Sequence, residues 1–212
     1  MSEVRPLERD QTPVAAAVLG RAFADSPAYL AALSHLDGRR REAALERVKR
    51  GFVEAAVRYH EAESIWVGPQ LAGVSLVLAP GQYPPTLRAE AWQASGCARS
   101  GARGIMSFIH LRTHNAKHHI TEPHYYLFVL GVDPAFQGRG LGRALLAKLH
   151  ERVDARRVAA YLETDTPRNV RLYESVGYSV LTDGGVRGLP GLRFWTMRRP
   201  VMPGPAREPS RA

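Results

Sequence analysis

Three glycines at alternate positions follow the longest uncharged apolar run of the chain. The segment reads QGRGLGR over residues 137–143. Glycine lets the main chain approach a ligand closely, and the free N–H groups at a helix N-terminus attract anions. Arginine adds charge-assisted hydrogen bonds to phosphate oxygens. The pattern therefore predicts a diphosphate site made of Gln137, Gly138, Arg139, Gly140, Leu141, Gly142 and Arg143.

Such a site needs a buried strand before the turn and a helix after it. The segment His124–Val132, HYYLFVLGV, is almost continuously apolar, which is typical of a central strand covered on both faces. After the turn, leucines recur every four residues from Leu141 to Leu149, which indicates an amphipathic helix. We therefore expect a strand, a glycine turn and a helix in succession.

Other nucleotide sites use similar turns. A phosphate-binding loop with GxxxxGK[ST] is excluded, because no lysine lies between Lys117 and Lys148. A dinucleotide fingerprint needs glycine where Arg143 stands, although Glu163 imitates its ribose-binding acid. The same acid would suit an adenosylmethionine-dependent methyltransferase. Few residues follow Gly142 for further strand and helix pairs, so the methyltransferase is the remoter alternative.

The remaining pattern predicts alternating strands and helices in one α/β domain. We expect strands at Val4–Leu7, Ser64–Gly68, Ala72–Ala79, Val158–Glu163, Tyr178–Leu181 and Leu192–Met197, with helices after Asp10 as the cap, within 38–63, and at Pro167–Val176. The domain spans residues 1–200. Residues 201–212 contain three prolines and little apolar content, so we expect a disordered tail.

Residues 91–121 contain no acidic side chain and several histidines. On a helix, His110, His114 and His118 would share one face at a spacing that also suits a zinc pair. The segment has no carboxylate among these histidines and no HExxH pattern. A substrate-facing helix and an ordinary solvated helix both stay open, and we predict no metal.

Composition excludes several classes of protein. The formal charge is +9, from 29 basic and 20 acidic residues. The arginines are spread along the chain, which argues against a nucleic-acid partner. The longest uncharged apolar run covers only residues 125–132, too short to span a membrane, and no secretory signal opens the chain, so we expect a cytoplasmic protein. The single Cys97 excludes an intramolecular disulfide.

The motifs resemble a known family. GVDPAFQGRGLGRALL is similar to the acetyl-coenzyme A motif of the GNAT superfamily of N-acetyltransferases, in which V-x-P precedes Q/R-x-x-G-x-G/A. Gln137, Gly140 and Gly142 match that signature. ETDTPRNVRLYESVGYSV resembles the second motif of the family, and the order of the motifs is most similar to puromycin-type acetyltransferases.

The resemblance implies a GNAT-like α+β fold, with a mixed, mostly antiparallel twisted sheet, a splayed central strand pair and flanking helices. It implies that main-chain groups of Leu130, Gly131 and Val132 pair with the pantetheine arm of acetyl-CoA, and that one N–H polarises the thioester carbonyl. Asn169 would contact the cofactor. Tyr173 would protonate the departing thiolate.

The acceptor implied is a primary amine of a small molecule that attacks the thioester directly. Its ammonium must lose a proton, so a base or a water relay is needed. Glu122 and His124, at the start of the central strand, are the first candidates for that base, and Glu163 is the third. A module that binds coenzyme A without turnover is the alternative. Homodimers are common in families of this kind, so a homodimer is compatible with the resemblance.

Overall fold

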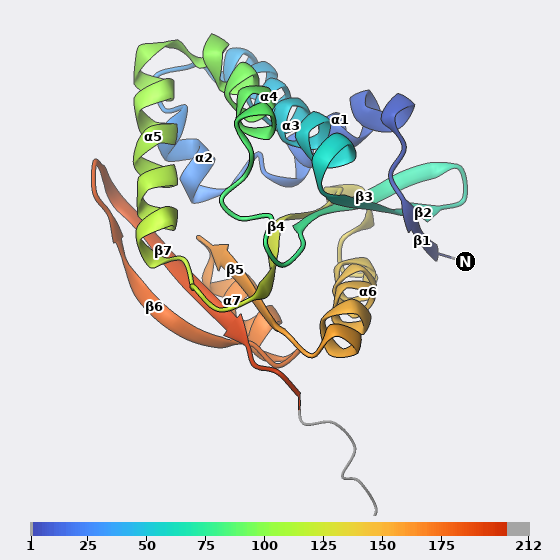
Figure 1. Cartoon of the computed structure of the whole chain (residues 1–212). Helices are drawn as coiled ribbons and strands as arrows, with labels where there is room; N and C mark the ends of the chain where they lie inside the picture. Colours follow the sequence, from blue (N-terminus) through green and yellow to red (C-terminus); the bar gives the residue numbers. More distant parts are fainter. Residues whose placement is uncertain (1, 203–212) are drawn as a thin grey trace, which may run out of the picture.

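The computed structural model describes residues 2–202, and its core is one seven-stranded sheet (Figure 1). The strand order is β1-β2-β3-β4-β5-β7-β6. The pair β4–β5 is parallel, and the other neighbours are antiparallel. The strands are β1 Ser2–Pro6, β2 Glu61–Val67, β3 Gln70–Leu78, β4 His124–Val132, β5 Ala159–Thr164, β6 Ser179–Val186 and β7 Leu189–Arg199.

Helices cover both faces of this sheet. They are α1 Thr12–Ala22, α2 Pro27–Ala32, α3 Gly38–Tyr59, α4 Leu87–Cys97, α5 Gly101–His118, α6 Leu141–Arg156 and α7 Pro167–Glu174, with short 3₁₀ turns at Arg9–Gln11, Ala98–Ser100 and Pro134–Phe136. Helices α1 and α3 lie on one face with α2, α4 and α5 nearby, whereas α6 lies on the other (Figure 1). The predicted mixed sheet with flanking helices is confirmed.

The side chains of β4 reach both layers of the core. Tyr125 and Leu127 pack with Leu149 of α6 and with α7. Val129 packs instead with Leu19 of α1 and with α3. Burial of each such side chain contributes about 1.5–3 kcal/mol, so both layers are needed to hold the central strand in place.

A bulge changes the course of β4. Its register with β3 pairs Val129 with Leu76 and Leu127 with Val77, so Phe128 is the extra residue. A bulge of this kind bends a strand and increases its twist. The pairing of β4 with β5 runs from His124 only as far as Leu127. The two central strands therefore separate beyond Leu127, and the predicted splayed pair is confirmed.

Most predicted elements are confirmed, with corrections at their ends. Asp10 is not the cap of the first helix, because it lies in the preceding 3₁₀ turn and Gln11 occupies the N-cap position. That helix ends at Ala22, and α2 begins at Pro27. The long helix ends at Tyr59, since residues 61–63 already belong to β2.

The last two strands are longer than predicted. They form a hairpin that contains several glycines and polar side chains. These residues interrupt the alternation of apolar and polar residues by which a strand is predicted from sequence. The predicted tail lies outside the described residues from residue 203 onward. Among the described helices, none has both the length and the apolar character that crossing a bilayer requires.

Candidate active site

A cavity of about 620 Å³ opens where β4 and β5 separate. Residues 126–130 of β4, residues 163 and 164 of β5 and the following Asp165 line it. Phe23 and Phe52 reach it from the helices on one face, and Asn169 and Tyr173 of α7 reach it from the other layer. The cavity therefore passes through the sheet at the splay, which makes it accessible to groups from both faces.

The wall of this cavity is largely aromatic and aliphatic. Its apolar and aromatic lining residues include Phe23, Tyr29, Phe52, Tyr83, Pro84, Ile105, Phe108, Ile109 and Phe194. Three carboxylates, those of Glu90, Glu163 and Asp165, also line it. Arg112 lines it too, and its guanidinium is paired with Glu90 at 2.5 Å. Such a cavity suits a ligand with an apolar body and a positive charge.

The glycine turn lies at the end of β4 and leaves its main chain open. Gly138 and Gly140 have φ values of 78° and 77°, and a Cβ at either would meet nothing within 4 Å. Gly140 is the N-cap residue of α6. The Gln137 Nε2 donates to the carbonyl of Val132 at 3.0 Å, which ties the turn to the strand end. The first N–H groups of α6 therefore face an uncovered region, as an anion requires.

Two arginines stand beside that turn. Arg143 donates to Ser175 Oγ at 2.8 Å, and Arg139 lies with its guanidinium 5.2 Å from the ring centroid of Phe136. Both side chains are exposed. The turn itself is held by Asp133, whose carboxylate accepts from Arg21 Nε at 2.8 Å. The predicted diphosphate residues thus lie together in one open, positively charged turn.

The unpaired edge of β4 adjoins the same region. Leu130 lines the cavity. Gly131 packs against α1 so closely that a Cβ would come within 2.7 Å of Leu19 Cδ2. Val132 lies at the end of the strand, beside the turn. These main-chain groups beyond Leu127 have no β5 partner, so they are available to an extended ligand.

Asn169 and Tyr173 are one turn apart on α7, and both line the cavity. Tyr173 is buried, and burial, with the nearby charge of Asp165 as a second cause, raises the pKa of its hydroxyl. The phenol therefore stays protonated at neutral pH. The structure brings together these two residues as the sequence predicted.

Glu122 is not among the cavity-lining residues. Its carboxylate is exposed and bonded by Arg198, whose Nη2 donates to Oε2 at 3.1 Å while Nε also donates to the other oxygen. The hydrogen bond from Arg198 lowers the pKa of this carboxyl. The structure therefore places Glu122 in a surface ion pair at the start of β4, whereas the splay lies at the other end of the strand.

His124 is buried beside Glu122 but does not line the cavity. Its Nδ1 lies 2.6 Å from the carbonyl oxygen of Glu122, and its Nε2 lies 3.0 Å from His119 Nε2. Burial lowers the pKa of the His124 imidazole. His124 is therefore linked to the cavity only through contacts with other side chains.

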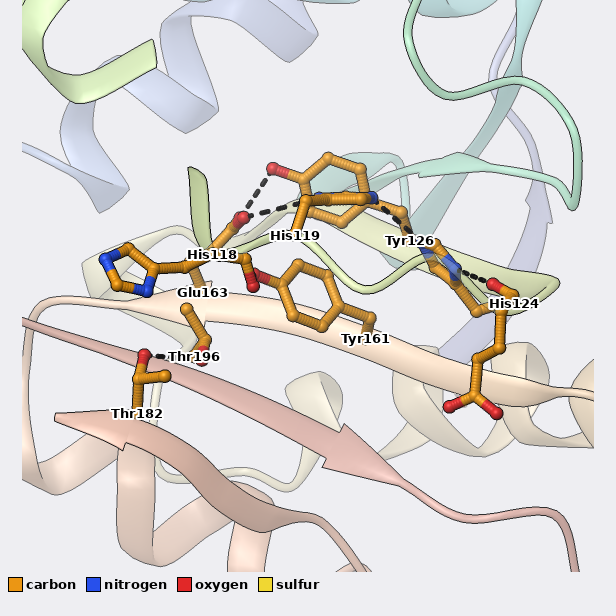
Figure 2. Close-up of polar contacts among 9 residues, drawn as sticks. His118, His119, His124, Tyr126, Tyr161, Glu163, Thr182 and Thr196 are labelled. Carbon is orange, nitrogen blue, oxygen red and sulfur yellow. Dashed lines mark hydrogen bonds and ion pairs between the residues drawn. The ribbon is translucent and has the colours of Figure 1, made fainter. Parts of the chain in front are cut away.

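Glu163 is the carboxylate that the structure places in the cavity wall close to the splay (Figure 2). Its Oε2 accepts from the Tyr126 hydroxyl at 2.5 Å. Its Oε1 lies 3.8 Å from His119 Nδ1. From the sequence, Glu163 was only the third candidate for the base, and His119 was not a candidate. The residues that these two side chains contact come from distant parts of the chain, which local patterns do not reveal.

The histidines of α5 do not form a cluster. The helix is confirmed, and the rings of His114 and His118 lie 4.6 Å apart. His110 packs instead against Gly188 in the turn between β6 and β7. Within residues 2–202, no group of three or more His, Cys, Asp or Glu side chains is arranged to hold a metal ion.

A buried lysine lies close to the cavity and was not predicted from the sequence. Lys49 of α3 is fully buried, and its Nζ donates to the Tyr29 hydroxyl at 2.8 Å. The ammonium also lies 3.3 Å from the ring centroid of Phe23. Burial holds the pKa of Lys49 well below its usual range, while the charge of Asp165 acts in the opposite direction. The amphipathic pattern of α3 does not predict that this lysine is buried.

Comparison with known proteins shows which proteins this chain resembles. Residues 82–178 match the acetyltransferase (GNAT) family. A mycothiol acetyltransferase from Mycobacterium ulcerans is 33% identical over 139 residues, which cover 59% of this chain and 41% of that protein. The N-alpha-acetyltransferase RimI of Mycobacterium tuberculosis is 42% identical over 81 residues, which cover 35% of this chain and 48% of that protein. The chain thus spans less than half the length of these relatives.

A solved structure shows the fold. A protein from Corynebacterium glutamicum, described as a histone acetyltransferase and related acetyltransferase, superposes with a TM-score of 0.68 at 22% identity and covers 95% of this chain and 98% of its own. The fold is therefore that of the GNAT acetyltransferases. The finer resemblance to puromycin-type enzymes is not confirmed by these matches.

Proposed function

We propose that this chain, which has the GNAT fold and matches the GNAT acetyltransferase family over residues 82–178, transfers an acetyl group from acetyl-CoA to a primary amine of a small molecule. The observation that carries the proposal is the cavity at the splay, which is lined by the open strand edge at Leu130 and by the carboxylates of Glu163 and Asp165.

The open turn fits the diphosphate of acetyl-CoA. Gln137, Gly138, Arg139, Gly140, Leu141, Gly142 and Arg143 would hold it, with the dipole of α6 favouring its negative charge. The edge of Leu130, Gly131 and Val132 would bind the pantetheine arm, with Asn169 beside it. When bound, acetyl-CoA supplies an activated acetyl thioester.

Residues of the chain would then manage charge and protons. A main-chain N–H of the free β4 edge polarises the carbonyl under attack. Tyr173, kept protonated by its burial, donates a proton to the departing thiolate. Glu163, in the cavity wall, faces the acceptor amine and stabilises its positive charge on binding. The amine attacks directly, so no covalent enzyme intermediate is needed.

The cavity supports an acceptor amine with an apolar or aromatic body. Aromatic faces from Phe52, Tyr83 and Phe108 surround the space that Glu163 and Asp165 make acidic. A polyamine would leave those apolar walls without a partner. A cation with one apolar end satisfies both kinds of surface.

The test is a panel of amines, with acetyl transfer followed as release of free thiol from acetyl-CoA. Phenethylamine and puromycin represent aromatic amines, spermidine represents polyamines, and a short peptide represents a protein α-amine. We expect the aromatic amines to have the highest kcat/KM. A preference for the peptide would replace the small-molecule acceptor with a protein N-terminus.

The alternative is a module that binds acetyl-CoA without turnover. Both readings predict that acetyl-CoA raises the melting temperature, because a ligand of the native state stabilises it by mass action. The module predicts no thiol release with any amine. Stabilisation by adenosylmethionine in place of acetyl-CoA would contradict both readings.

A further inference from the structure

Four groups form a continuous chain from the cavity wall to the start of β4 (Figure 2). Glu163 Oε1 faces His119 Nδ1, His119 Nε2 faces His124 Nε2, and His124 Nδ1 faces the carbonyl oxygen of Glu122. The last two contacts are hydrogen bonds of 3.0 and 2.6 Å. The first contact is 3.8 Å, longer than a hydrogen bond.

The hydrogen-bond chemistry determines where the protons of both imidazoles lie. A carbonyl oxygen only accepts, so His124 Nδ1 carries a hydrogen. Because burial lowers the pKa of His124, its ring is neutral at pH 7 and its Nε2 holds a lone pair. His119 Nε2 must then be the donor in the bond between the rings. A neutral His119 therefore has its lone pair on Nδ1.

That lone pair points toward a carboxylate. His119 Nδ1 and Glu163 Oε1 are both buried and lack a hydrogen-bond partner among the described residues. Both side chains are only 5% exposed. Two unpaired acceptors facing one another in a buried site are unfavourable, and one added proton would convert their contact into a charge-assisted hydrogen bond. When neither atom carries a hydrogen, the pair therefore has room for one proton between His119 Nδ1 and Glu163 Oε1.

We propose that Glu163 and His119 form a one-proton site that takes the proton of the acceptor ammonium, and that His124 positions His119 in the receiving tautomer. The proposal rests on the proposed function and extends it. Glu163 touches the cavity and is the catalytic residue. His119 acts through Glu163, and His124 acts through His119.

The proton balance is complete. The bound ammonium gives one proton to Glu163, which shares it with His119 Nδ1, and the neutral amine then forms the new C–N bond as the C–S bond breaks. The nitrogen loses its second proton to Tyr173, which has given its own proton to the thiolate. The products are the amide and the free thiol. The proton on the pair returns to solvent when the product leaves.

The charged and titratable groups around the pair come from several elements. Tyr126 of β4 donates to Glu163. Tyr161 of β5 and Tyr83, in the loop before α4, pack against the His119 ring. The more distant groups are His114, Arg112 and Glu90. Burial raises the pKa of each of these three tyrosines, so all three stay neutral at pH 7. These three tyrosines therefore do not take up the proton that we assign to Glu163 and His119.

The test compares pH profiles of kcat/KM for the wild type, Glu163→Gln and His119→Gln with one active amine. At pH 7 we expect each variant to be slower by about 100-fold or more, the range of general-base catalysis. Near pH 10 a substantial fraction of an amine with a pKa of about 10.4 is already neutral in solution, so the difference should shrink to about threefold. His124→Phe should cost about tenfold at pH 7, because a wrong tautomer disables a neighbouring base.

His35→Gln is the matched control. His35 Nε2 also bonds to a main-chain carbonyl, that of Ser100 at 2.7 Å, but it does not line the cavity. We expect its profile to match the wild type. A loss that is constant from pH 7 to pH 10 in His119→Gln would mean a structural role only and would overturn the proposal.

A second measurement does not depend on turnover. ¹⁵N chemical shifts of the imidazoles at pH 7 should show the Nδ1–H tautomer for His124 and the Nε2–H tautomer for His119. In Glu163→Gln, the amide should donate to His119 Nδ1 and shift that nitrogen. The opposite tautomers would overturn the one-proton site even in an active enzyme. Correct tautomers with no thiol release from any amine would refute only the proposed function.

Discussion

Leu127 of β4 and Leu162 of β5 are the last two residues through which these parallel neighbours pair. Beyond them β4 stays with β3, and β5 stays with β7. Phe128, the bulged residue, comes directly after this point. The cavity therefore depends on one local change in the course of β4, and the side chains that follow it on both strands line the opening.

Tyr173→Phe is expected to lower kcat by about 100-fold while leaving the Kd for acetyl-CoA nearly unchanged, since only proton donation is lost. The ring keeps its place in the core with Tyr178, 5.8 Å away between centroids. Stopped-flow thiol release and calorimetric titration measure the two quantities. Tyr178→Phe is the control, and an equal loss there would remove Tyr173 from its role.

Gly140→Ala should weaken acetyl-CoA binding by at least about tenfold, or 1.4 kcal/mol, because its Cβ enters the open turn. The positive φ at Gly140 also strains the backbone by about 1–2 kcal/mol. Gly68→Ala is the control, because Gly68 in the β2–β3 turn also has a positive φ, 58°, and open space where a Cβ would lie. It should lose similar stability and keep its affinity. Equal affinity in both variants would argue against the diphosphate site.

Lys49→Met should alter how stability depends on pH. The folded pKa of Lys49 lies below its unfolded value, so between the two the unfolded state binds the extra proton and stability rises with pH. Removing the group should flatten that rise by up to about 1.4 kcal/mol per pH unit. Urea unfolding of both proteins at pH 7, 8 and 9 measures the difference. Parallel curves would show that Lys49 is not desolvated.

Glu122→Gln distinguishes the surface carboxylate from Glu163. It should change kcat/KM less than about twofold, because its ion pair with Arg198 lies outside the cavity, and destabilise the fold by less than about 1 kcal/mol. The lowered pKa means that this small stabilisation is present above about pH 4.3 and is lost as pH falls through the folded pKa. A large kinetic loss would restore Glu122 as the base.

Local patterns in the sequence determined much of the fold. The apolar run of β4, the glycine turn and the leucine spacing of α6 each report the environment of consecutive residues, so their elements and their order could be predicted. Asn169 and Tyr173 were also within reach, because two residues one turn apart on a helix share a face.

The tertiary structure decided which side chains meet. Glu163 contacts Tyr126 and His119 only because β5 pairs in parallel with β4, and that register places Tyr126 opposite Tyr161. Lys49 meets Tyr29 through the packing of α3 on α2. Contacts between distant segments depend on strand register and helix packing, which the whole chain sets, whereas a local pattern describes only the surroundings of its own residues.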